Sequence, residues 1–499
     1  MDIMFIVQVI ILLGSIFIGI RFGGIAIGYA GGLGVILLGL GCGMFVDTKM
    51  IPWDVVLIIM AVIAAISAMQ LAGGLDYMVK IAEKILRKNP KHINFLAPTV
   101  TYFLTILAGT GHTAFSMMPV IVEVAKEQGI KPKAPLSIAV VSSQIAITAS
   151  PVSVAVVYLS GVLEPFGWSY PALLAVWIPT TYIGCMITAF IITKITDLDL
   201  SKDPVYLERL KQGLVTPPKG AKNMTITKEG KLSVLIFVVG VIFIVLYATA
   251  ISKIGGKPVL VEHVMVNRDS AIIGTMLTIA TLISWFCKIQ VSKITETSVF
   301  KSGMVASVCV IGVAWLGTVF VNGYTTQIKE LSEQWVTAIP ALLAVVYFFA
   351  AMLLYSQAAT AKAITPVVVT ALGITAADPH NAYMIVASFA AVSALFVLPT
   401  YPTLLGAVHM DDTGTTRIGK YVFNHAFFLP GILAIGISVG LAFVMTGIRY
   451  DWYYGLIKNN QIRLSHTKRC DGLFYMHKKS PIKGAFLLVI IMTFTLYYF

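Results

Sequence analysis

The sequence predicts an all-α polytopic membrane protein of two inverted-topology repeats, each containing a re-entrant hairpin and a broken helix. Of its 499 residues, 58% are hydrophobic and 12% are charged, whereas soluble domains carry about 25% charged residues. The apolar residues also form blocks close to the roughly 20 residues that cross a bilayer as a helix. Four of these blocks are interrupted by polar breaks, three of which contain glycine or proline while the fourth is followed by Pro366.

Short charged connectors separate the apolar blocks that we predict to be spans. The blocks cover residues 3–20, 23–45, 52–72, 93–126, 136–163, 169–193, 232–251, 270–287, 301–321, 338–375, 382–410 and 422–447. The first block lacks the basic residues that precede the apolar core of a cleaved signal peptide, so we expect it to be a span.

Basic residues gather in alternate connectors and indicate the orientation of the chain. Connectors 75–91, 126–135 and 194–231 hold five, three and eight Lys or Arg residues. The positive-inside rule places these connectors in the cytoplasm and the amino terminus outside. Block 93–126 has a basic connector on each side, so it is predicted to enter and return as a re-entrant hairpin. Its tip at 108–113 should line a cavity, because lipid cannot satisfy free backbone groups.

The same arrangement recurs in the second half of the chain. A polar break at 355–362 predicts a second hairpin, which enters from outside. Each hairpin is followed by a broken helix, with its break at 150–153 in the first half and at 398–403 in the second. The spacings agree, since Pro119 and Pro151 are 32 residues apart and Pro366 and Pro399 are 33 apart. The alternative is that these breaks are only kinks in a helical bundle.

These features divide the chain into four parts. Residues 1–193 form the first repeat, 194–231 a cytoplasmic linker and 232–447 the second, inverted repeat. Residues 448–499 form an atypical extension, basic and then apolar, to which we assign no role. The sequence is compatible with a homo-oligomer but does not fix the oligomeric state.

Paired interrupted spans in two inverted halves are typical of secondary transporters with a substrate site near the membrane midplane. Half-helix amino termini at the breaks favour anions, and Lys362 is a basic residue predicted to lie within a break, where a charge is costly and usually functional. The candidate substrate-binding residues are Thr110, Gly111, His112, Thr113, Ser150, Pro151, Ser153, Ser356, Gln357, Thr360, Lys362, Pro399, Thr400 and Thr403. Each hydroxyl has the alternative role of a helix cap, and Lys362 that of a snorkelling side chain.

The distribution of acidic residues bears on energy coupling. Asp and Glu residues lie at span ends or in connectors, so no buried carboxylate is predicted to relay protons, and exchange of anions is favoured over proton symport. His112 as a proton carrier and coupling to Na⁺ at half-helix ends remain alternatives. Metalloprotease, nucleotide-loop and hydrolase-elbow motifs do not occur. We therefore expect no enzyme activity, no cofactor, no metal site and no nucleic-acid partner.

Several motifs together resemble the anaerobic C4-dicarboxylate transporter (Dcu) family over residues 1–447. They are Met60–Met69, Ala72–Asp76, Gly109–His112, Thr148–Ser153, Ser356–Ala359, Leu398–Pro402 and Asp412–Thr416. The resemblance implies a multi-pass carrier of the bacterial inner membrane that exchanges fumarate, malate, aspartate or succinate, with succinate efflux in anaerobic respiration. A sodium-coupled dicarboxylate symporter is the alternative.

Overall fold

A computed structural model describes most of the chain. The described residues are 3–22, 25–51, 53–216, 226–254, 257–258, 260–261, 263–324, 342–376, 378–399, 401–419 and 423–466. Residues 1–447 form one compact unit and residues 448–499 a second. The candidate site lies in the first unit, and the fold is described for that unit alone. The end of the predicted extension, residues 467–499, lies outside the described residues.

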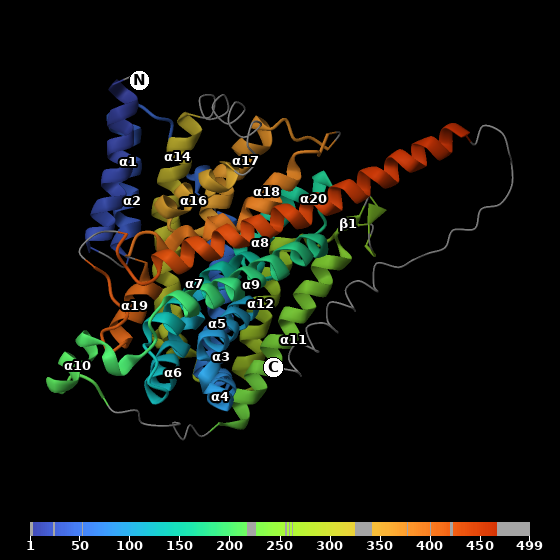
Figure 1. Ribbon diagram of the computed structural model, residues 1–499. Coiled ribbons are helices and arrows are strands. Elements are labelled where there is room, and N and C mark those ends of the chain that lie inside the picture. The colour runs from blue at the N-terminus through green and yellow to red at the C-terminus, as the bar shows by residue number, and fades with distance from the viewer. Residues whose placement is uncertain are drawn as a thin grey trace. The chain divides into compact units, whose positions relative to one another are not determined.

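The described chain is almost entirely helical (Figure 1). Its helices are α1 Ile3–Phe22, α2 Ala26–Ile36, α3 Trp53–Leu71, α4 Gly74–Lys88, α5 Ile93–Ala108, α6 Ala114–Glu127, α7 Lys133–Ala146, α8 Val154–Leu163, α9 Tyr170–Ile195, α10 Pro204–Lys211, α11 Lys228–Ala250, α12 Arg268–Phe286, α13 Ser298–Cys309, α14 Trp315–Gly323, α16 Leu342–Leu354, α17 Gln357–Ala371, α18 Ala382–Ser388, α19 Pro402–Met410 and α20 Phe428–His466. The two-residue strands β1 Lys253–Ile254 and β2 Lys257–Pro258 pair antiparallel in the connector after α11.

Within the described residues, six helical segments are long and apolar enough to cross a membrane. They are Lys133–Phe166, Tyr170–Ile195, Lys228–Ala250, Arg268–Phe286, Ser298–Phe320 and Phe428–Gly447. The pair Val56–Leu71 and Gly74–Lys88, bent by 76°, makes a seventh if it counts as one broken span. The predicted all-α polytopic class is confirmed. The inverted orientation of the two halves and the domain boundaries inside 1–447 stay predictions.

Helix α7 lies at the centre of the packing, because every residue from Ala134 to Ala146 is buried. It packs against α5, α6, α9 and α19, as can be followed in Figure 1. The Thr101 hydroxyl of α5 donates to the main-chain oxygen of Ala139 at 2.9 Å and so fixes α5 against α7. In lipid the hydrophobic effect does not drive helices together, so small side chains and hydrogen bonds between helices stabilise their packing.

The first predicted hairpin consists of α5, a break at 109–110, a 3₁₀ turn at Gly111–Thr113, and α6. Helix α5 ends at Gly109, whose φ of +69° is a left-handed conformation that glycine adopts without strain. Arg87, in the last turn of α4 and six residues before α5, forms an ion pair of 2.6 Å with Glu127 at the last residue of α6. The two ends of the hairpin therefore lie together, which supports entry and return on one side.

The second predicted hairpin consists of α16 and α17, which pack against each other. The Tyr347 hydroxyl of α16 lies 2.8 Å from the Thr365 hydroxyl of α17. Between the helices stand Tyr355 and Ser356, and Tyr355 has a φ of +54°. The connector before α16, residues 325–341, lies outside the described residues, so the side from which this hairpin enters stays a prediction.

The described part of the predicted linker packs on two loops of the compact unit. Lys131 pairs with Asp197 at 2.8 Å, and Ile130 forms an antiparallel bridge with Asp199. Farther along, Thr216 donates to the carboxylate of Asp412, which also accepts from Lys126 at 2.9 Å. The linker is therefore tied to both halves of the chain.

Candidate functional site

The break in the first broken helix is built from small polar side chains that satisfy backbone groups. A 3₁₀ turn at Ile147–Ala149 precedes it and α8 follows. Ser150 donates to the main-chain oxygen of Ile106 at 2.6 Å. Ser153 accepts from the Val156 amide as the amino-terminal cap of α8 and donates to the oxygen of Ile147. Both hydroxyls thus stabilise the break, as the alternative capping role requires.

The second broken helix repeats this arrangement. A 3₁₀ segment at Phe389–Phe396 precedes its break, and α19 begins at Pro402. Pro399 stands in the break, and Thr400 lies outside the described residues. The rings of Tyr355 and Tyr401 lie 6.1 Å apart. The break of the second hairpin therefore contacts the break of the second broken helix.

The two breaks of the first half also meet. A Cβ placed on Gly109 would lie 3.1 Å from the main-chain oxygen of Val152. Glycine, which has no side chain, lets the hairpin backbone approach the break at 150–153 this closely without a crowded contact. Each predicted hairpin thus contacts the break of the broken helix in its own half.

Gln144 joins the two halves at the level of these breaks. Its Nε2 donates to the Thr403 hydroxyl of α19 at 3.1 Å, and its main-chain oxygen accepts from Gln357 Nε2 of α17 at 3.2 Å. A Cβ on Gly111 would lie 2.6 Å from its side-chain nitrogen. Three of the predicted residues are therefore brought together around Gln144: Gly111 and Thr403 at its side chain and Gln357 at its main-chain oxygen.

Gln144 itself is not among the residues predicted from the sequence to bind substrate. The residue is fully buried, and its Oε1 has no hydrogen-bond partner among the described residues. The available signal was an amide in the middle of the apolar block 136–163, because polar side chains inside a span are costly and tend to be functional.

The hydroxyls of the second hairpin have local partners. Ser356 accepts from the Ala359 amide at 3.2 Å and caps α17, and Thr360 donates back to the Ser356 oxygen at 2.7 Å. In the first hairpin, Thr113 donates to the Thr110 oxygen and lies 3.1 Å from the Thr105 hydroxyl. These hydroxyls therefore stabilise the two breaks through local hydrogen bonds.

Lys362 lies in the second turn of α17, not in a break as predicted. The helix begins earlier than expected because Ser356 caps it and alanines follow. The ammonium lies 5.1 Å from the centre of the Tyr158 ring on α8, which is within range of a cation–π contact. Its positive charge thus lies between the second hairpin and the first broken helix.

Two predicted residues contribute through their backbone. Pro151 accepts a hydrogen bond at its main-chain oxygen from the buried Tyr170 hydroxyl. His112 belongs to the 3₁₀ turn at the first hairpin tip, and its side chain lies outside the description. Among the described residues, no group of three or more His, Cys, Asp or Glu side chains is placed to hold a metal ion.

The resulting site is suited to an anion. Helices α17 and α19 begin at the segments that contact Gln144, and their amino termini carry partial positive charge. Lys362 adds a full positive charge nearby. The residues that contact Gln144 are uncharged.

Comparison with known proteins identifies the family. The profile of the family described as "Anaerobic c4-dicarboxylate membrane transporter" matches residues 4–450. The C4-dicarboxylate transporter DcuA of Helicobacter pylori strain J99 is 61% identical over 88% of this chain and 98% of its own length. DcuA of Wolinella succinogenes is 60% identical over 89% of this chain and 100% of its own length, and DcuA of Escherichia coli K12 is 53% identical over 89% and 99%. Among solved structures, the YdaH transporter of Alcanivorax borkumensis is 14% identical with a TM-score of 0.47, covering 82% of this chain and 87% of that one. The chain belongs to the anaerobic C4-dicarboxylate membrane transporter family, a family of membrane transporters and not of enzymes.

Proposed function

We propose that this chain exchanges C4-dicarboxylates across the bacterial inner membrane and binds them where the hairpin breaks and broken helices meet around Gln144. Fumarate, malate and aspartate would enter, and succinate would leave. The observation that supports the site is the convergence of Gly111, Gln357 and Thr403 on one buried residue, Gln144. The names of the relatives support the substrate class.

The Gln144 amide supplies either a donor or an acceptor to a substrate. Which end carries the oxygen is an assignment made from its neighbours. When Gln144 Nε2 donates to the Thr403 hydroxyl, Gln144 Oε1 can accept a hydrogen bond from a donor such as the ammonium of aspartate. When the amide turns over, the Thr403 hydroxyl donates to the oxygen and the amide N–H groups are left for a carboxylate. One residue can thus serve both amino and non-amino dicarboxylates.

Lys362 is proposed to balance the charge of one carboxylate, and the half-helix amino termini of α17 and α19 that of the other. A dianion that leaves water needs both, because an isolated buried charge is very costly. The contact of Lys362 with Tyr158 on α8 supports this role, since it places the ammonium against the first broken helix.

Exchange is favoured over coupled symport because no acidic side chain contacts Gln144 among the described residues. A carrier without a proton-binding carboxylate at its site can return loaded with another anion. The second candidate is sodium-coupled symport, in which backbone carbonyls at the helix breaks would hold Na⁺.

Uptake into proteoliposomes tests the proposal. Labelled fumarate or aspartate is supplied outside, with or without internal succinate and with or without Na⁺. Exchange predicts uptake that internal succinate accelerates strongly and that Na⁺ leaves unchanged. Equal rates into empty vesicles, or an absolute need for Na⁺, would exclude it.

A pair of variants tests the site. Gln144→Met keeps the size of the side chain and its backbone bond to Gln357, whereas Gln144→Glu adds a negative charge in the same volume. An anion site predicts that the carboxylate is the more damaging change. Dicarboxylate exchange by Gln144→Glu at the parent's rate would show that the substrate binds elsewhere.

A further inference from the structure

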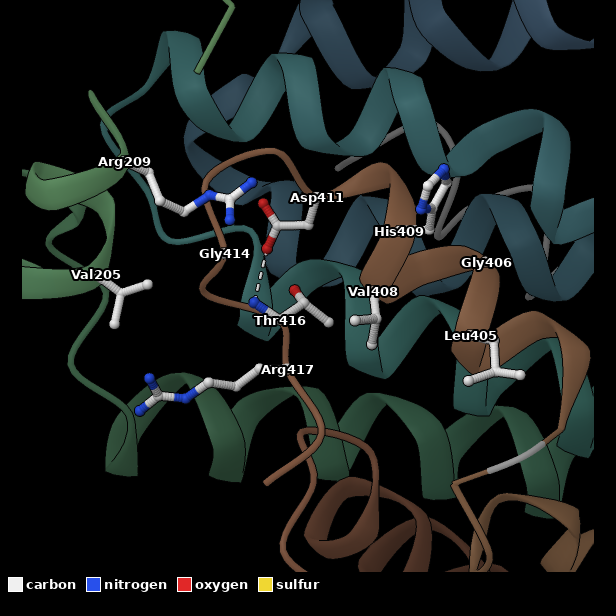
Figure 2. Close-up of a pocket in the computed structure, with 10 residues that line it drawn as sticks. All are labelled: Val205, Arg209, Leu405, Gly406, Val408, His409, Asp411, Gly414, Thr416 and Arg417. Carbon is white, nitrogen blue, oxygen red and sulfur yellow. Dashed lines mark hydrogen bonds between the residues drawn. The ribbon is translucent and has the colours of Figure 1, made fainter. Parts of the chain in front are cut away.

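A cavity lies along α19, from Leu405 to the end of that helix, between it and α10 of the linker (Figure 2). Its volume is about 820 Å³. Residues 411–417, here called the inner loop, form one wall. Helix α19 connects the two regions: Thr403 contacts Gln144, and Asp411 follows eight residues later, roughly 12 Å along a helix. The positive-inside distribution places this end in the cytoplasm.

The inner loop is organised around the buried Asp411. Its carboxylate accepts from the amide and hydroxyl of Thr413, the hydroxyl of Thr415 and, at 2.7 Å, the amide of Thr416. The acid is therefore fully engaged within the loop. The neighbouring Asp412 is paired with Lys126 at 2.9 Å, so neither carboxylate is available to bind a cation in the cavity.

The hydrogen-bond donors that line the cavity are not engaged in this way. Figure 2 shows Arg209 reaching from α10 toward the inner loop, and Arg417 at the end of that loop. Arg209 donates through Nε to the main-chain oxygen of Asp412 at 2.8 Å, and its two terminal nitrogens form no hydrogen bond with the residues that the structure describes. The same holds for the side chains of Arg417 and His409. The Thr416 hydroxyl is buried and also has no partner in the described part of the chain.

We propose that this cavity is a second anion site, which holds a dicarboxylate at the cytoplasmic face before it reaches the site at Gln144 or after it leaves. The inference rests on the proposed function for its substrate. Two arginines outnumber the one carboxylate in the wall, and clefts lined by one sign of charge raise the local concentration of the opposite ion. The cavity is open and far larger than one dicarboxylate, so the anion is held with its water and weakly.

Sided exchange kinetics test the inference. Right-side-out vesicles are loaded with increasing succinate, and uptake of external labelled fumarate is measured. Arg417→Gln should raise the internal succinate concentration for half-maximal rate by about threefold or more, and external half-saturation should be unchanged. The effect should shrink at high salt, because steering of this kind is screened. Arg417→Lys should retain most of the parent's behaviour.

Lys211→Gln is the matched control, because it removes one positive charge from α10 at an exposed position that does not line the cavity. It should leave both half-saturating concentrations unchanged. Equal changes on both sides, a change only outside, or no change in Arg417→Gln would overturn the proposal.

Equilibrium binding separates this inference from the proposed function. Purified protein should bind labelled succinate at a tight site and at a weak, salt-sensitive site. Arg209→Gln with Arg417→Gln should remove only the weak site, and Lys362→Gln should weaken only the tight one. A parent that does not exchange dicarboxylates but keeps the weak site would refute the proposed function alone. A single class of sites in the parent would refute the second anion site.

Discussion

The side-chain nitrogen of Gln357 lies 3.2 Å from the main-chain oxygen of Gln144. This hydrogen bond joins the first turn of α17, in the second half of the chain, to α7 in the first. The Gln144 side chain then continues to Thr403 on α19. A movement that exposes the candidate site to one side of the membrane has to rearrange these hydrogen bonds. Binding of substrate at this position would therefore directly affect the contact between the two halves.

Gly111→Ala is expected to lower exchange while leaving the fold intact. The new methyl group would lie 2.6 Å from Gln144 Nε2, and the end of that flexible side chain can move aside at little cost in stability. Displacing the amide should nevertheless disturb the site, and a loss of roughly 1–3 kcal/mol from broken polar contacts corresponds to about fivefold to 150-fold in rate or affinity. Exchange and thermal melting are measured on the same preparation.

Gly161→Ala is the control for that change, because Gly161 of α8 has no heavy atom within 4 Å of the position of its Cβ. It should exchange like the parent and be more stable by up to about 1 kcal/mol. If both alanine variants exchange like the parent, the packing of Gly111 on Gln144 has no functional role.

Lys362→Gln should reduce dicarboxylate affinity by about two orders of magnitude or more. Removing one member of a buried charge pair typically costs about 3–5 kcal/mol, and about 1.4 kcal/mol corresponds to tenfold in affinity. Binding of labelled fumarate to purified protein measures the change. Lys194→Gln is a suitable control, because Lys194 also lies over an aromatic ring, Phe190 at 5.8 Å, but is exposed. If Lys362→Gln binds fumarate like the parent, Lys362 does not balance a substrate carboxylate, and the helix amino termini alone neutralise the charge of the substrate.

Arg268→Leu should lower thermal stability. The buried guanidinium donates to Ser160 at 2.7 Å, pairs with Glu164 at 3.0 Å and lies over the Tyr170 ring, so it joins α12 to the end of α8. The loss should be about 3 kcal/mol, near the low end for a buried pair because Glu164 is partly exposed. Arg268→Lys should lose less, since it keeps the charge. Melting temperatures equal to the parent's in both variants would contradict this account.

The sequence located the breaks but not the residue that joins them. Glycine, proline and serine at 109–111, 150–153 and 398–402 mark interruptions that the structure contains, because these residues act on the backbone of their own segment. Gln144 was overlooked because its partners, Thr403 and Gln357, are 259 and 213 residues away. The position of Lys362 was wrong by one turn because the Ser356 cap starts α17 early. Contacts between distant segments leave no periodic signal in either segment.

Docking of the linker should be insensitive to pH between about 5 and 9. The pKa of Asp412 lies below its usual value, because hydrogen bonds from Thr216 and Lys126 outweigh the opposing effect of burial. The stability that the Asp412 contacts give to the docked linker is therefore present above the ordinary carboxyl pKa. It is lost only as the pH falls through the lower pKa of the folded state. The hydrogen bond to Asp197 raises the pKa of Lys131, so that contribution is present below the ordinary lysine pKa and is lost only at higher pH. Neither loss falls within the stated range.

Hydrogen exchange of the α10 amides, corrected for intrinsic rates, measures this docking. Protection should be constant from about pH 5 to pH 9 in the parent, for the reason just given. Asp412→Asn should lower protection across that range, because it removes the charge that Lys126 and Thr216 hold. Lys202→Gln, which breaks only the exposed pair with Asp199, should change protection little, since exposed pairs contribute about 0–1 kcal/mol. Neither an aspartate nor a lysine with an ordinary pKa titrates between about pH 6 and 8. Protection that falls steeply in that range would therefore mean that a different titrating group holds the linker in place.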